Sequence, residues 1–197
     1  MRMHLPSLGL VLMLFCAGHA MAVEEPKYDV LLTEGDFEVR KYAPQLIAET
    51  VVTGDMDEAS NKGFRLIADF IFGNNQAPNA ASSEKIAMTA PVTIEPQTAE
   101  QWRINFVMPS RYTLESIPKP KNSAVRLKEI PNKTFVVLKY SGFNSASKVQ
   151  TKNQEAKEWA LQKNFKIIGA PQLSRYDPPW TLPMFRRNEI MLEVSVP

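Results

Sequence analysis

The stretch DMDEASNKGFRLIADFIFG, residues 55–73, predicts a helix that organises the rest of the chain. Asp55 is a preferred N-cap, and Glu58 three residues later completes a capping box. Gly73 suits the left-handed backbone that ends many helices. Apolar residues recur between these signals at steps of three and four and form one packing face: Met56, Ala59, Gly63, Ile67 and Phe70. A second apolar row lies beside that face, so the helix has more apolar surface than packing on one sheet requires: Phe64, Ala68 and Phe72.

The segments around this helix predict strands, and their order occurs twice. Alternating and β-branched residues indicate five strands in the first half: 28–32, 37–42, 45–53, 85–94 and 102–108. The second half predicts a helix and four more strands: helix 145–163 and strands 125–130, 133–140, 167–176 and 189–196. A shift of 88 residues aligns Val39 with Leu127 and Ile47 with Phe135. We therefore predict an α+β fold in which two fused units close one sheet or barrel with two helices outside, and chance similarity of two α+β halves is the alternative.

The first 22 residues have the pattern of a secretory signal peptide. Arg2 precedes a ten-residue apolar run, 8–17, and an AMA sequence at the end of the segment fits a signal peptidase site. The run is shorter than the ~20 apolar residues of a membrane-spanning helix. A lipoprotein signal centred on Cys16 is the alternative, which the bulky residues before that cysteine disfavour. We expect a cleaved leader, 1–22, a single mature domain, 23–197, and a location in the periplasm or outside the cell, with no transmembrane segment in the mature chain.

Cleavage of this leader leaves a chain without histidine or cysteine, because His4, His19 and Cys16 all lie in it. Such a chain lacks the side chains for Cys–His or Ser–His catalysis, for zinc sites of the usual type and for disulfides. It also lacks a histidine or cysteine ligand for haem iron. The leader contains one basic residue, Arg2, and no acid, which leaves 22 basic and 21 acidic side chains and a net charge of +1. With neither sign clustered, we expect no nucleic-acid partner.

Two stretches are distinctive enough to indicate a family. KIAMTAPV, residues 85–92, opens the predicted strand 85–94, and YDPPW, residues 176–180, is followed by RRNEI, residues 186–190. Together with residues 39–42, the helix and the repeat, they resemble the SOUL or haem-binding protein family over residues 28–196. The resemblance implies a distorted antiparallel β-barrel of two pseudo-repeated βαββ-like halves, about 28–110 and 123–197, flanked by two α-helices. It also implies non-covalent tetrapyrrole binding in an apolar pocket beside the first helix.

On the first helix, Phe64 and Ala68 match the family's pocket-facing positions, so the resemblance places them against a porphyrin face. Packing under a loop is the alternative, and it is favoured for Phe72. Lys62 and Arg65 are candidates to pair with haem propionates, with solvated surface charge as the alternative. The family's basic residues are expected near two positions that differ here: Asn61 and Asp69.

Three candidates lie outside the helix. Met88 can close the pocket or ligate iron weakly, and core packing on a strand is the alternative. Tyr176 is a conceivable oxygen ligand to ferric iron, and Trp180 can form a lip over the pocket. The alternative for both is a stiff loop that packs its own rings. For Arg186, Arg187 and Glu189 we expect a buried Arg–Glu pair, because burying one charge alone is costly.

The resulting hypothesis is an exported binding protein that holds haem or another tetrapyrrole by burial, with weak or absent axial ligation, as a carrier or scavenger. The alternative is the same fold with haem binding lost, binding another apolar small molecule or a protein partner. A tetrapyrrole-degrading enzyme is disfavoured, because such oxygenases need a strong iron ligand. The sequence leaves the oligomeric state open.

Overall fold

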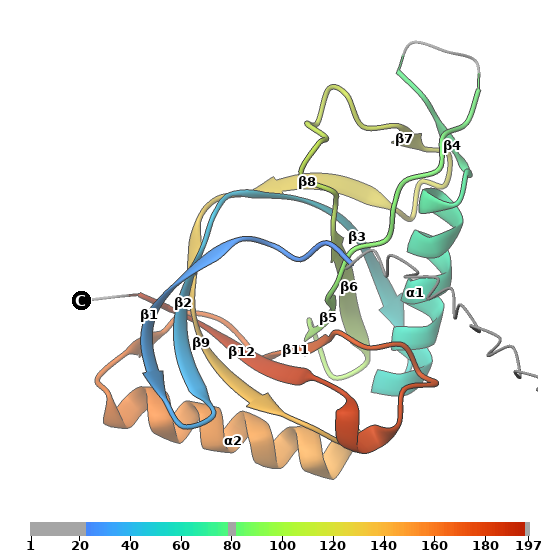
Figure 1. The fold of residues 1–197 in the computed structure, drawn as a ribbon. Helices are drawn as coiled ribbons and strands as arrows, with labels where there is room; N and C mark the ends of the chain where they lie inside the picture. Colours follow the sequence, from blue (N-terminus) through green and yellow to red (C-terminus); the bar gives the residue numbers. More distant parts are fainter. Residues whose placement is uncertain (1–22, 79–81, 196–197) are drawn as a thin grey trace, which may run out of the picture.

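The structure is a computed structural model that describes residues 23–78 and 82–195, so the predicted leader, 1–22, lies outside the described residues (Figure 1). Most of the expected elements form with nearly the expected bounds, but the strand expected over 167–176 is divided into two short strands, 166–167 and 172–175. The helices are α1 (Met56–Ile71) and α2 (Ala146–Gln162), with a short 3-10 helix at Pro183–Phe185. The strands are β1 (Tyr28–Glu34), β2 (Phe37–Tyr42), β3 (Gln45–Thr53), β4 (Asn75–Gln76), β5 (Val92–Pro96), β6 (Gln101–Val107), β7 (Lys119–Pro120), β8 (Arg126–Ile130), β9 (Lys133–Tyr140), β10 (Lys166–Ile167), β11 (Gln172–Arg175) and β12 (Asn188–Ser195).

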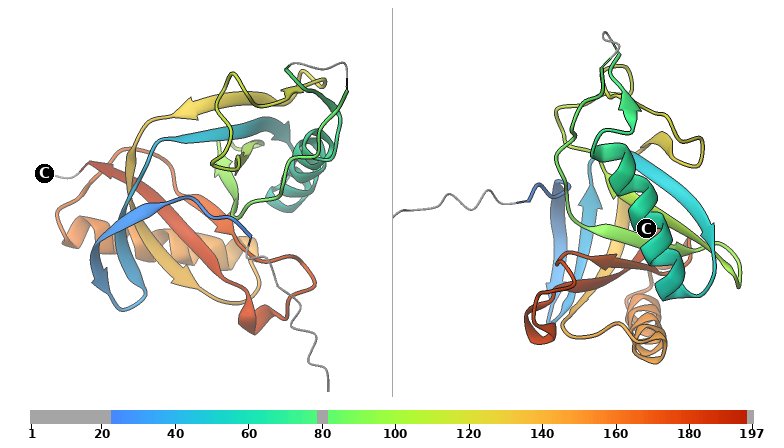
Figure 2. Two further views of the ribbon diagram at one scale, coloured as in Figure 1. Left: turned by 45° about the horizontal axis from the view of Figure 1, so that its top comes forward. Right: turned by 90° about the vertical axis from the view of Figure 1, so that its right-hand side faces the viewer.

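One curled antiparallel sheet forms a half-barrel, which confirms the predicted α+β fold. Its strand order is β1-β2-β9-β12-β11-β5-β6-β3-β8, with β10 added beside β12, and β4 and β7 pair separately. The strand order repeats in the two halves of the chain. In the first half β3 lies between β8 and β6, and in the second half β9 lies between β2 and β12. The pairing of β5 with β11 joins the two halves. Both helices lie outside the curl, α1 on β3 and β6 and α2 on β9 and β12 (Figures 1 and 2).

The ends of α1 confirm the predicted N-cap and the glycine after the helix, whereas the Glu58 side chain pairs with Lys62 and does not complete the predicted capping box. The Asp55 side chain accepts a hydrogen bond from the Glu58 amide at 2.8 Å, which satisfies one of the free N–H groups of the first turn. The helix stops at Ile71, and Gly73 follows with a positive φ of 131°. That backbone conformation favours glycine, because a side chain there would be strained.

One face of α1 is fixed tightly against the sheet. Ala59, Ile67 and Phe70 are buried there. Gly63 faces β6 so closely that an added Cβ would lie 2.3 Å from Ile104 Cγ1. The glycine in the middle of this helix is therefore a close-approach position between helix and sheet.

The two faces of the sheet bury different side chains. The convex face, under the helices, holds the main apolar core; its fully buried members include Ala48, Ile94, Ile104, Ile190 and Leu192. The concave face holds a smaller cluster of Tyr42, Phe135, Val137 and Met191, with Tyr28 packed against it. The rest of the concave face mixes polar side chains such as Glu49 and Arg103 with apolar ones such as Ile47 and Val107.

The strand expected over residues 85–94 begins only at Val92, so that prediction is wrong for residues 85–91. The amides of this segment bond elsewhere: the Ile86 amide donates to Ile71 O at 2.8 Å, and the Ala90 amide donates to Glu24 O at 2.9 Å. Pro91 has no amide to donate to a ladder. The segment therefore ties the end of α1 to the N-terminal residues instead of extending β5.

Candidate functional site

The outer face of α1 carries the second apolar row that the sequence indicated. Phe64 is 36% exposed and Phe72 is 55% exposed, whereas Ala68 between them is 9% exposed. The Phe64 ring packs against the Phe106 ring, with 5.7 Å between the ring centroids. Two phenylalanine rings eight residues apart thus remain open to solvent on one side of a helix whose other side is buried.

Met88 belongs to the segment that runs beside the end of this helix. It is 41% exposed, so it does not pack in the core as the alternative held. The hydrogen bond from the Ile86 amide to Ile71 O holds this segment at the last turn of α1. Met88 therefore adds an exposed apolar side chain two residues beyond the point where this segment is tied to the end of α1.

The charged groups of α1 differ in what they contact. Lys62 Nζ pairs with Glu58 Oε1 at 2.8 Å, which leaves it engaged within the helix. Asp69 accepts a hydrogen bond from Asn74 Nδ2 at 2.5 Å. Arg65 is exposed and contacts no charged or hydrogen-bonding partner in the part of the chain that the structure describes. Of the two cations predicted to bind propionates, Arg65 is the one whose guanidinium is available.

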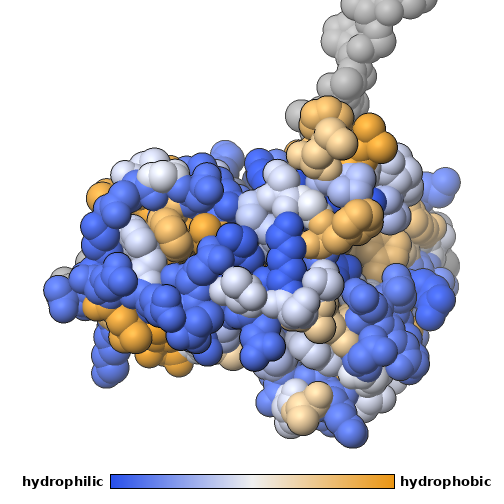
Figure 3. Space-filling model, turned by 90° about the horizontal axis from the view of Figure 1, so that it is seen from below, coloured by the Kyte–Doolittle hydropathy of each residue, from blue (hydrophilic) through white to orange (hydrophobic). Residues whose placement is uncertain are grey.

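The loop that follows β11 lies at the other end of α1. Arg175 Nη1 donates to Ser60 Oγ at 3.2 Å, and Arg175 Nη2 pairs with Asp57 at 3.3 Å, which ties β11 to the first turns of the helix. Trp180 in this loop is 83% exposed, so the loop does not pack all of its own rings as the alternative held. Three more apolar side chains of the same loop are also exposed: Leu182, Met184 and Phe185. The face of the molecule seen from below shows orange hydrophobic patches among blue hydrophilic residues (Figure 3).

Tyr176 lies in a buried polar network and not beside the apolar row of α1. Its hydroxyl donates to Glu189 Oε2 at 2.7 Å, and the Arg187 guanidinium carbon lies 3.5 Å from the centre of its ring. Burial, together with the neighbouring Glu189 carboxylate, raises the pKa of Tyr176 well above its ordinary value. The phenol therefore stays protonated and engaged, which is opposite to what an iron ligand requires.

The expected buried Arg–Glu pair exists, but its arginine is a different one. Glu189 and Arg40 are 1% and 2% exposed and form a bidentate pair with distances of 2.8 and 3.0 Å. Arg40 also donates to Tyr42 Oη at 3.1 Å and to Glu38 at 2.6 Å. Burial lowers the pKa of Arg40, but its hydrogen bonds with Glu189 and the charge of that carboxylate outweigh burial and raise it. Arg187 Nε is 4.0 Å from Glu189, at the edge of the pair.

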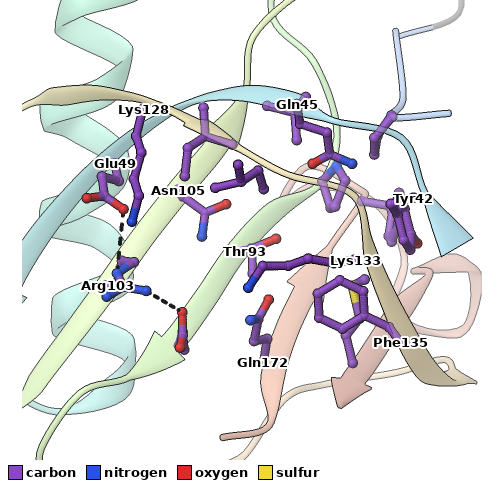
Figure 4. Close-up of a pocket in the computed structure, with 18 residues that line it drawn as sticks. Tyr42, Gln45, Glu49, Thr93, Arg103, Asn105, Lys128, Lys133, Phe135 and Gln172 are labelled. Carbon is purple, nitrogen blue, oxygen red and sulfur yellow. Dashed lines mark hydrogen bonds and ion pairs between the residues drawn. The ribbon is translucent and has the colours of Figure 1, made fainter. Parts of the chain in front are cut away.

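A hollow of about 110 Å³ lies on the concave face, on the opposite side of the sheet from α1 (Figure 4). One end is polar, with Glu49, Arg103, Asn105 and Lys128, and the other end is formed by the rings of Tyr42 and Phe135. The alternation of the strands produces this separation, because side chains on one strand point to opposite faces in turn. Polar residues alternate with apolar ones in Gln45–Thr53 and Gln101–Val107, which was a signal for polar side chains on the concave face. The sequence did not predict the hollow itself.

The sequence matches the family described as SOUL heme-binding protein over residues 23–193. The chain belongs to the SOUL haem-binding protein family. It matches no curated protein. Among solved structures, the EcmrR C-terminal domain is similar with a TM-score of 0.62 and 11% identity, covering 85% of this chain and 98% of that one. A hydrolase from Listeria innocua is similar with a TM-score of 0.54 and 15% identity, covering 84% and 94%. At these identities the two structures show a shared fold.

The described residues of this SOUL protein contain no group of three His, Cys, Asp or Glu side chains placed to hold a metal ion. Nor does any helix among them combine the length and apolar character needed to cross a membrane. The predicted site residues thus divide into three regions. Phe64, Ala68, Lys62 and Arg65 lie together on α1, with Met88 near its last turn, whereas Tyr176 faces the concave side. Trp180 lies on the exposed loop that follows β11.

Proposed function

We propose that this SOUL protein binds haem or another tetrapyrrole against the outer face of α1. The observation that carries the proposal is the exposed row of Phe64 and Phe72 on a helix whose opposite face already packs on the sheet. A flat macrocycle is held largely by the apolar surface that it buries. Phe64, Phe72 and Met88 supply such a surface, whereas Ala68 between the two rings is largely buried and contributes little to it.

The energetics of such a site rest on burial. Covering about 200 Å² of apolar protein surface and about the same area of the macrocycle contributes about 10 kcal/mol at ~25 cal/mol per Å². Part of this is offset by the lost freedom of the bound molecule. We expect micromolar, reversible affinity, which suits a carrier or scavenger better than a permanent cofactor site.

Polar contacts orient the macrocycle in this proposal. Arg65 is available to form a charge-assisted, bidentate pair with a propionate. Lys62 reaches the same ligand only if it leaves Glu58. Bound haem would supply iron, and Met88 offers an exposed thioether, the kind of group that can ligate iron weakly. Tyr176 is excluded from that role by its hydrogen bond to Glu189.

The biological setting is part of the same proposal. The leader pattern in residues 1–22 supports export to the periplasm or the exterior. A mature chain without histidine or cysteine supports binding without strong axial ligation, and therefore a binding protein rather than an oxygenase.

The test is a haem titration of the mature chain, followed by the Soret band, with two variants. Phe64→Asp places a charge in the apolar row and is expected to weaken binding at least tenfold, since an unpaired charge is costly to bury. Leu161→Asp is the matched control, because Leu161 is 62% exposed on α2, and it is expected to bind as the wild type does. Equal loss in both variants would contradict the site. If the wild type shows no Soret shift at micromolar haem, haem is not its ligand. The alternative function, binding of another apolar molecule or of a protein partner, then remains.

A further inference from the structure

The loop between β11 and β12 carries an exposed apolar tip at residues 178–185, and it projects from the sheet at one corner of the molecule (Figure 2). Four exposed apolar side chains belong to the tip: Trp180, Leu182, Met184 and Phe185. Phe143 is exposed beside them, since the guanidinium of Arg186, which follows the tip, lies 5.4 Å from its ring centre. The three aromatic side chains, at ~150–250 Å² each, leave on the order of 400 Å² open to water. A contiguous apolar patch of this size marks an interaction site.

The tip satisfies most of its carbonyl groups within the loop itself. Those that accept a hydrogen bond there belong to Pro178, Pro179, Thr181, Leu182 and Pro183. The side chain of Arg186, at the foot of the tip, donates two of these bonds, from Nε to Thr181 O at 2.8 Å and from Nη2 to Pro179 O. The three prolines have no amide to satisfy. An apolar medium cannot replace the hydrogen bonds of water, so a loop that closes its own bonds enters such a medium at low cost.

The charges around the tip fit a zwitterionic lipid surface. Residues 178–185 contain no charged side chain. One acid and one base flank them: Asp177 accepts from the Arg187 amide at 2.6 Å, and Arg186 bonds to loop carbonyls and to no acid among the described residues. The tip therefore enters a bilayer interface without burying a charge, while Arg186 stays at the level of the headgroups. A protein partner is matched less well, because protein interfaces have a polar, hydrogen-bonded rim that this tip does not supply.

The predicted leader joins the folded domain at the foot of this loop. The described chain begins at Val23, and Glu25 pairs with Arg187 Nη2 at 2.5 Å. Residues 1–22 contain the apolar run 8–17, which engages a membrane during export. Under the export proposed above, the loop thus reaches the lipid surface together with the point of leader cleavage. The composition and the hydrogen bonds of the tip are independent of that export.

We propose that residues 178–185, together with Phe143, insert into the interface of a zwitterionic lipid bilayer and dock the mature chain reversibly on the membrane surface. Trp180 takes the headgroup level that suits an indole ring, and the apolar side chains of Leu182, Met184 and Phe185 contact the acyl chains. This surface uses none of the residues proposed to bind a tetrapyrrole on α1.

The experiment is flotation of the mature chain with phosphatidylcholine vesicles. The wild type is expected to float with the lipid. Phe185→Asp is expected to lower the partition coefficient at least tenfold, since it places a charge where the acyl chains would lie. Ile168→Asp is the matched control and is expected to float as the wild type does. Ile168 is exposed like Phe185, but its amide bonds to Glu193 O, towards the opposite end of β12.

Tryptophan fluorescence identifies the inserted segment. Phosphatidylcholine that carries bromine on its acyl chains is expected to quench the wild type and to leave Trp180→Phe largely unquenched. Trp159 is buried in the core and Trp102 is partly buried against it, so neither is open to lipid as Trp180 is.

Several results would overturn the proposal. One is no flotation of the wild type at about 1 mM lipid, since a marginal lipid anchor with a binding constant of ~10⁴ M⁻¹ is largely bound at that concentration. Another is equal flotation of Phe185→Asp and Ile168→Asp. A wild-type dimer that Phe185→Asp makes monomeric, without flotation, would assign the patch to a second copy of the chain. Haem titration of Phe185→Asp is expected to match the wild type, so this proposal and the site on α1 fail separately.

Discussion

Replacement of Arg40 by methionine is predicted to destabilise the fold strongly, although it removes no part of the main apolar core. Arg40 and Glu189 are 2% and 1% exposed, and they join β2 to β12 across the concave side. In Arg40→Met, Glu189 keeps the hydroxyl of Tyr176 at 2.7 Å and Arg187 Nε at 4.0 Å. The carboxylate is then buried with one hydrogen bond and one distant cation.

The structure allows the magnitude to be estimated. Removing one partner of a buried ion pair costs about 3–5 kcal/mol, because the other charge remains buried and uncompensated. The contacts that Glu189 keeps place Arg40→Met at the lower end, about 3 kcal/mol. The double variant Arg40→Met/Glu189→Leu removes both charges and is expected to be more stable than Arg40→Met alone, since replacing a buried pair by apolar groups is often neutral.

Urea unfolding of the mature chain, followed by circular dichroism, measures these differences in the free energy of unfolding. Arg126→Met is the control: Arg126 is exposed on β8 without a partner among the described residues, so a change within about 0.5 kcal/mol is expected. A cost below about 1 kcal/mol for Arg40→Met would refute the reasoning. So would a double variant whose destabilisation equals the sum of the two single ones.

Three further predictions concern packing, pH and capping. Gly63→Ala is expected to lower the free energy of unfolding by about 1–3 kcal/mol in urea titrations, because its Cβ would overlap Ile104, and a stabilised variant would contradict this close approach. Burial raises the pKa of Tyr42 and of Tyr140 to about 12, above the ~10 of an unfolded chain, so the folded chain binds more protons between these values. The urea midpoint should therefore fall as the pH rises from about 10 to 12, and a constant midpoint would argue against buried neutral phenols. Asp55→Ala should cost about 1 kcal/mol in the same assay and Asp55→Asn much less, since asparagine also caps; equal losses would exclude a capping role.

Much of the fold could be predicted because its signals are local. Strands 37–42, 45–53 and 133–140 were expected with the bounds that the structure gives them. Residues 85–91 could not be assigned from their own sequence, because their amides bond to Ile71 and Glu24, which are far away in the chain. Partners of this kind become visible only in three dimensions.

The same distinction applies to the two sites. The apolar row of α1 could be predicted from helical periodicity alone, since Phe64 and Phe72 lie on one helix. Arg40 and Glu189 are 149 residues apart, so the sequence indicated a buried Arg–Glu pair near Glu189 but suggested the wrong arginine. The concave hollow draws its lining from eight strands, and the sequence does not show which residues of those strands become neighbours.

The position of bound haem on α1 is tested most directly by NMR of the mature chain with ferric haem, because the unpaired electrons of the iron broaden nearby amide signals. We predict broadening of the backbone signals of Phe64, Arg65 and Ala68, with the signals of Asn105 and Gln172 unchanged on the far side of the sheet. Broadening of Asn105 and Gln172 with sharp signals from α1 would contradict the account.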